Sequence, residues 1–99
     1  MQISADRIYR EHADRVCLTL VQSELDLAFF NLRLAEAEIQ GGKAAHATEL
    51  VAKAVIAHKI VLLELARITD VYESKRELAA EARRLLESIQ SVERKFRIL

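Results

Sequence analysis

The chain has 99 residues, 52% of them hydrophobic, and its fifteen basic and fifteen acidic residues leave a formal net charge of zero. This size and composition indicate one globular domain and exclude a disordered chain. Nucleic-acid binding by the whole surface is not favoured, because it usually leaves a strong basic excess. The single cysteine, Cys17, excludes an internal disulfide framework and fits a reducing compartment, so we interpret it as a partly buried, inert thiol.

The N-terminal residues do not resemble a signal peptide, because no apolar stretch follows a basic one. The longest apolar runs, such as residues 60–63, are far too short to span a bilayer. We therefore expect a cytoplasmic protein.

The residue types favour helices throughout. Proline is absent and glycine occurs only twice, while alanine, leucine, glutamate and arginine dominate. We predict an all-α fold in a single domain spanning residues 1–99, with helices at about 4–40, 43–69 and 74–97.

The first predicted helix begins with Ser4 as its N-cap and ends at Gly41 and Gly42, where glycine can adopt the left-handed conformation that closes a helix. Two apolar stripes run along it in alternating steps of four and three residues. We call the first stripe the first seam; its members are Tyr9, Ala13, Val16, Leu20, Ser23, Leu27, Phe30, Leu34 and Ala37. The other, the second seam, consists of Leu18, Val21, Leu25, Ala28, Leu32, Ala35 and Ile39.

At about 100° per residue, the two seams lie on nearly opposite sides of this helix. The second seam begins only at Leu18, because its earlier register positions are Asp14, Glu11, Arg7 and Ser4. We therefore expect the helix to be gripped on two sides over residues 18–39 and to carry a single apolar stripe before that.

The second predicted helix, residues 43–69, is the most apolar and covers most of its circumference with aliphatic side chains. The short connection at the two glycines requires an antiparallel hairpin, which places this helix against residues 18–39 of the first.

The third predicted helix carries a heptad seam that runs from Leu78 to Leu99. Two capping-box spacings, Asp70 with Glu73 and Ser74 with Glu77, favour a turn near residues 69–74. One continuous helix from 43 to 97 is the alternative, since no glycine or proline enforces the turn.

These elements predict an up-down-up three-helix bundle that self-associates. The second helix takes one side of the first, and the third helix, a second copy of the chain, or both must take the other. In a simple three-helix bundle the neighbours of a helix lie only about 60° apart, whereas the seams are much farther apart. We expect a homodimer in which the interface residues of the first seam are Tyr9, Val16, Leu20, Leu27, Phe30 and Leu34.

Candidate chemical sites are sparse. His46 and Glu49 are three residues apart and could reach one metal ion, but a solvated pair is the simpler interpretation. His58 is expected to be packed or at an interface, and His12 to be at the edge of the first seam. Glu24 and Glu38 are the carboxylates most expected to be buried. We predict no catalytic residue, no bound metal and no cofactor.

Arg76, Arg83 and Arg97 recur at one heptad position of the third helix and could contact phosphates or an anionic membrane. Glutamates interleave with this stripe, and positive charge near a helix C-terminus is favourable by itself. We find no strong nucleic-acid or membrane signal.

The segment from Leu34 to Gly42, followed by Ala47, Val51 and Ala54, resembles a single tetratricopeptide hairpin, in which small residues let paired helices approach closely. The first helix is more than twice as long as a helix of that repeat, and no second repeat follows. No peptide-binding function is inferred from this resemblance.

Three functions remain open. The first is a non-enzymatic interaction or oligomerisation module, such as an adaptor or small chaperone that covers another protein's amphipathic helix. The second is an enzyme or metal-binding bundle with a site at the dimer interface, and the third is anionic membrane or nucleic-acid association through the arginine stripe. The surplus apolar seam favours the first.

Overall fold

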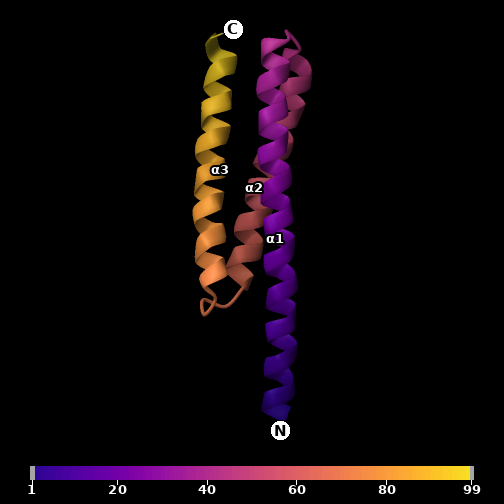
Figure 1. Ribbon diagram of the computed structural model, residues 1–99, viewed down its shortest axis with the longest axis vertical. Coiled ribbons are helices and arrows are strands. Elements are labelled where there is room, and N and C mark those ends of the chain that lie inside the picture. Colours follow the sequence, from indigo (N-terminus) through magenta and orange to yellow (C-terminus); the bar gives the residue numbers. More distant parts are fainter. Residues whose placement is uncertain (1, 99) are drawn as a thin grey trace.

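In the computed structural model, three helices follow one another in an up-down-up arrangement (Figure 1). The structure describes the backbone of residues 2–98 and the side chains of residues 5–97. Helix α1 spans Gln2–Gln40, α2 spans Ala44–Arg67 and α3 spans Glu73–Ile98. Because α1 already begins at Gln2, Ser4 lies within the helix and the prediction that it is the N-cap is wrong. No strand occurs in this range, which confirms the predicted all-α class and three-helix arrangement.

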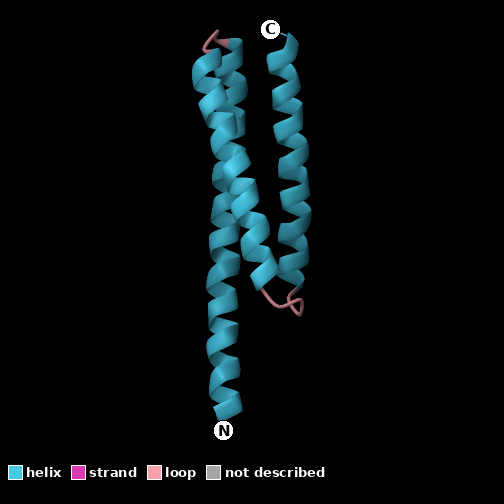
Figure 2. Cartoon of the chain, turned by 180° about the vertical axis from the view of Figure 1, so that it is seen from behind, coloured by secondary structure: helices cyan, strands magenta, loops and turns pink. Residues whose placement is uncertain are grey.

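The turn between α1 and α2 closes with a Schellman motif. The Lys43 N–H donates to the Glu38 carbonyl at 2.8 Å, and the Gly42 N–H donates to the Ile39 carbonyl at 3.1 Å. Gly42 has φ +79°, a left-handed conformation that glycine adopts without a Cβ penalty. The hairpin is therefore tight, and α2 runs back along α1 (Figure 2).

A loop at residues 68–72 separates α2 from α3, so the two are not one continuous helix. Helix α3 begins at Glu73, so neither Asp70 nor Ser74 is the residue that directly precedes it, and the capping-box interpretation is wrong. Asp70 instead pairs with Lys75, whose ammonium group also donates to the Ile68 carbonyl at 2.7 Å. One lysine thus satisfies a carbonyl group at the end of α2 and fixes the loop.

The core of the molecule lies between the second seam of α1 and the inner faces of α2 and α3. Small residues on α1 and α2, such as Ala28, Ala35, Ala47 and Ala54, are completely buried and let the hairpin helices approach closely. The remaining core is aliphatic: Val21, Leu25, Leu32, Leu50, Val51, Ala57, Val61, Leu65, Ile68, Leu78, Ala82, Leu85, Ile89 and Val92. Both α2 and α3 therefore pack on the same seam of α1.

Polar contacts show on which sides of α1 the two other helices lie. On one side, His46 of α2 lies 3.5 Å from Glu38. On the other, Gln22 donates to Glu81 of α3 at 3.3 Å, and Lys95 donates to Glu36 at 3.0 Å. Neither α2 nor α3 covers the first seam.

The N-terminal part of α1 projects beyond the rest of the molecule (Figure 1). Asp14 is level with the loop after α2, because it accepts a hydrogen bond from Thr69 at 2.9 Å. Residues 2–13, here called the extension, therefore have no neighbouring helix in the chain. The extension makes the molecule 62 Å long and only 18 Å by 15 Å across.

Candidate interaction surface

The first seam of α1 lies on the surface. Its six large members, each between 36% and 78% exposed, are Tyr9, Val16, Leu20, Leu27, Phe30 and Leu34. They extend from the extension to the last third of the helix, a distance of about 38 Å at 1.5 Å per residue. A long apolar stripe of this kind typically marks a site of protein association.

In the extension, as in the rest of α1, the side chains on the two opposite sides of the helix differ in character. On the side that continues the core, Arg7 and Glu11 are exposed and form an ion pair at 3.7 Å. On the side of the first seam, Tyr9 is the most exposed of the six large members of the stripe. The side of the extension that continues the core is therefore charged and compatible with water, whereas the side of the first seam is apolar and compatible with a packed neighbour.

Helix α2 carries a second exposed apolar set, Ile56, Ile60 and Leu63, whose members are between 40% and 65% exposed. Ile60 is one helical turn from Glu64, whose carboxylate lies near the Cys17 thiol of α1 and raises its pKa. The set therefore lies on the side of α2 that borders α1. We call Ile56, Ile60 and Leu63 the α2 patch.

The α2 patch and the first seam lie at the same height along the hairpin. The contacts Asp14 with Thr69, Cys17 with Glu64 and Glu38 with His46 each join residues whose numbers add to between 81 and 84. With this antiparallel register, Ile60 is level with Ser23. The α2 patch thus lies beside the middle of the first seam.

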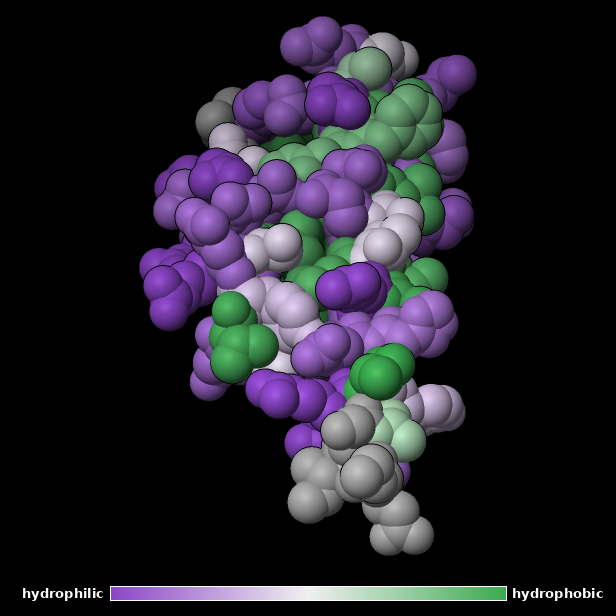
Figure 3. Space-filling view, turned by 60° about the horizontal axis from the view of Figure 1, so that its bottom comes forward, coloured by the Kyte–Doolittle hydropathy of each residue, from purple (hydrophilic) through white to green (hydrophobic). Residues whose placement is uncertain are grey.

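In Figure 3, hydrophilic side chains dominate the side on which α3 lies, and hydrophobic ones are exposed along the side on which α1 lies. Other exposed large hydrophobic residues lie outside the two stripes: Ile8, Leu62, Val71 and Leu86.

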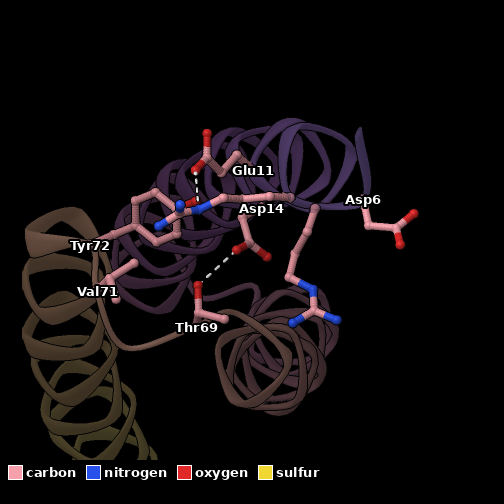
Figure 4. Close-up of a pocket in the computed structure, with 8 residues that line it drawn as sticks. Asp6, Glu11, Asp14, Thr69, Val71 and Tyr72 are labelled. Carbon is pink, nitrogen blue, oxygen red and sulfur yellow. Dashed lines mark hydrogen bonds and ion pairs between the residues drawn. The ribbon is translucent and has the colours of Figure 1, made fainter. Parts of the chain in front are cut away.

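A pocket of about 460 Å³ lies between the extension and the α2–α3 loop (Figure 4). Asp14 is at its inner end, 7% exposed, and is the buried charged residue that we did not predict. Its position on the register of the second seam was the available signal. Burial and the negative charges of Asp14 and Glu11 raise the pKa of Tyr72, which keeps this hydroxyl in its neutral form.

The carboxylates and histidines singled out in the sequence lie apart from this pocket. Glu24 and Glu38 are only partly buried, so the expectation that they are the most buried carboxylates is wrong. His46 faces Glu38 and not Glu49, His58 is half-buried, and His12 is exposed. Among the described side chains, no group of three or more histidine, cysteine, aspartate or glutamate residues could hold a metal ion.

Cys17 is half-buried between α1 and α2. Burial raises the pKa of its thiol, and the adjacent Glu64 carboxylate raises it further. A raised pKa leaves less of the nucleophilic thiolate at neutral pH.

The three predicted anion-contacting residues, Arg76, Arg83 and Arg97, are exposed on α3. Within residues 5–97 they form no salt bridge, whereas the neighbouring Arg84 lies 4.0 Å from Glu81. None of the helices in residues 2–98 has a stretch that is long and apolar enough to cross a membrane.

Comparisons of the chain with protein-family models, with curated proteins and with solved structures find no match.

Proposed function

We propose that this chain is a non-enzymatic helical interaction module that self-associates through the first seam of α1. The observation that carries the proposal is the exposed apolar stripe, which continues from the three-helix body into the extension. Within the chain, α2 and α3 pack on the second seam and on the residues that border it, so the six large residues of the first seam remain exposed.

The exposed apolar area is comparable to that of a standard-size dimer interface. Six residues of the first seam and three of the α2 patch are each at least one-third exposed. Their exposed parts amount to on the order of 800 Å² per copy, the area that each partner buries in a standard-size interface. A second copy brings an identical stripe, which makes the match self-complementary.

The extension also supports a partner on the seam side. An isolated helical segment of about twelve residues is marginal in water, and most helical stability in proteins comes from packing of an apolar face. Tyr9 and Ala13 provide that face, and no helix of the same chain reaches them.

The test is the absolute mass in solution, measured by light scattering on a sizing column at several concentrations. We expect a mass of twice the chain that dissociates on dilution. The variant Leu20→Asp, on the first seam, should yield the monomer, whereas Leu86→Asp, at a 40% exposed position of α3 outside the two stripes, should leave the mass unchanged. A wild-type chain that stays monomeric at high micromolar concentration would overturn the proposal.

A further inference from the structure

The arrangement of the exposed stripes indicates how two copies meet. This inference rests on the proposed self-association and adds its symmetry. The surface to be covered has three parts: the first seam beside the three-helix body, the α2 patch, and the seam residues of the extension.

The first seam is symmetric about Ser23. The members before Ser23 lie 3, 7, 10 and 14 residues from it, and the members after it lie 4, 7, 11 and 14 residues from it. Leu20 and Leu27 flank the small Ser23 at the centre. A reversed second copy of the helix would therefore place a seam residue opposite each seam residue, with the alanines Ala13 and Ala37 opposite the larger Leu34 and Tyr9 of the partner copy. Val16 would lie beside the partner's Phe30, and Leu20 beside the partner's Leu27.

The α2 patch is centred at the same height. Ile56 and Leu63 lie four and three residues from Ile60, and the register of the hairpin places Ile60 level with Ser23. One twofold axis perpendicular to the helices can therefore pass through both centres, at Ser23 of α1 and at Ile60 of α2. It pairs α1 with α1 and α2 with α2, each antiparallel.

An axis parallel to the helices leaves apolar surface uncovered. If α1 packs on the partner's α2, the partner helix ends at Arg67, level with residue 16, and Tyr9 and Ala13 have no neighbour. If α1 instead packs parallel on its own copy, the α2 patch faces the polar edge of the partner's α1, which carries Thr19, Asp26 and Arg33. The perpendicular axis places Tyr9 and Ala13 of each copy beside residues 33–37 of the other.

We infer that the chain forms an isologous antiparallel dimer whose twofold axis crosses α1 at Ser23 and α2 at Ile60. Each extension lies along the hairpin end of the other copy. The interface is a four-helix layer made by α1 and α2 of both copies, and both α3 helices lie on the outside.

Pulsed electron paramagnetic resonance between spin labels tests this symmetry. On a Cys17→Ser background, His12→Cys and Gln40→Cys each place one label per chain at an exposed position of α1. An axis at Ser23 predicts distances between the two copies of about 35 Å for position 12 and about 50 Å for position 40, at 1.5 Å per residue. The mass of each labelled protein is measured in the same buffer.

The outcomes separate the symmetry from the proposed function. A dimeric mass with both distances below about 25 Å would mean a parallel axis and would overturn the antiparallel inference alone. If the unlabelled wild-type chain and both labelled variants have a monomeric mass, and the labelled variants show no dipolar distance, self-association and the symmetry are both overturned. A dimeric mass with distances of about 35 Å and about 50 Å supports both self-association and the antiparallel symmetry.

Discussion

Leu27→Asp places a carboxylate in the middle of the first seam without entering the core. Leu27 is 57% exposed and is not part of the buried cluster. The three-helix body should therefore fold, with a loss of about 1 kcal/mol from helix propensity and partial burial. In the proposed dimer, however, this position is close to the twofold axis and is covered in both copies.

The size of the effect follows from the exposed fraction. Complete burial of a leucine contributes about 1.5–3 kcal/mol, so covering the exposed part of Leu27 contributes about 1–1.5 kcal/mol per copy. Two copies lose about 2–3 kcal/mol, and burying two carboxylates adds to this loss. Since 1.4 kcal/mol changes a dissociation constant tenfold, we expect dimerisation to weaken at least about 100-fold.

Sedimentation velocity over a concentration series gives the dissociation constant, and urea unfolding followed by circular dichroism gives the free energy of unfolding. Leu62→Asp is the matched control, because Leu62 is 49% exposed on α2 but lies outside the α2 patch. Glu36→Lys is a second control, since it only replaces the partly exposed ion pair with Lys95 by a repulsion between two lysines. Equal dissociation constants for Leu27→Asp and the wild type would refute the assignment of the first seam as the interface.

Three further predictions concern the three-helix body. Gly42→Ala should lower the free energy of unfolding by about 1–2 kcal/mol because of its φ of +79°, whereas Gly41→Ala, whose added Cβ meets only ordinary contacts, should leave it unchanged or raise it. Asp14→Ala should destabilise by about 1–3 kcal/mol in urea unfolding, because it removes the acceptor for the loop hydroxyl, while Asp14→Asn should lose less. The hydrogen bond and charge of Lys75 lower the pKa of Asp70, so this pair should stabilise the fold above the unfolded pKa of about 4. That part of the stability should disappear as pH falls through the lowered pKa, and Asp70→Asn should remove this part of the pH dependence; an unchanged acid limb in the variant would contradict it.

Periodicity was sufficient to predict the helices and the hairpin. The steps of four and three gave both seams of α1, and the two glycines gave the turn that Gly42 makes. The turn before α3 was placed correctly but for the wrong reason, because the decisive group is the Lys75 ammonium rather than a capping box. Contacts of a long side chain with a backbone carbonyl have no periodic signature.

Which seam faces the chain's own helices could not be predicted from hydrophobicity, since both seams are apolar. The difference is in side-chain size. Ala28 and Ala35 of the second seam meet small residues of α2, whereas the first seam carries Leu27, Phe30 and Leu34. A tight turn forces the hairpin helices close together, so the seam with alanines is the one that a hairpin can bury. Asp14 was missed because a single polar residue at a core register position is more often solvated.

In the proposed dimer, the length of α1 would tie the folding of its N-terminal part to the concentration of the protein. No helix of the chain packs on the backbone of the extension, so in a single chain this part of α1 is supported by its junction with the rest of the helix and, at its inner end, by the α2–α3 loop. The proposed self-association would add contacts to the extension, and the fraction of associated chains would rise with the protein concentration. Amide hydrogens of the extension should therefore exchange at a rate set by mass action, while those of the hairpin exchange at a rate set by the fold alone.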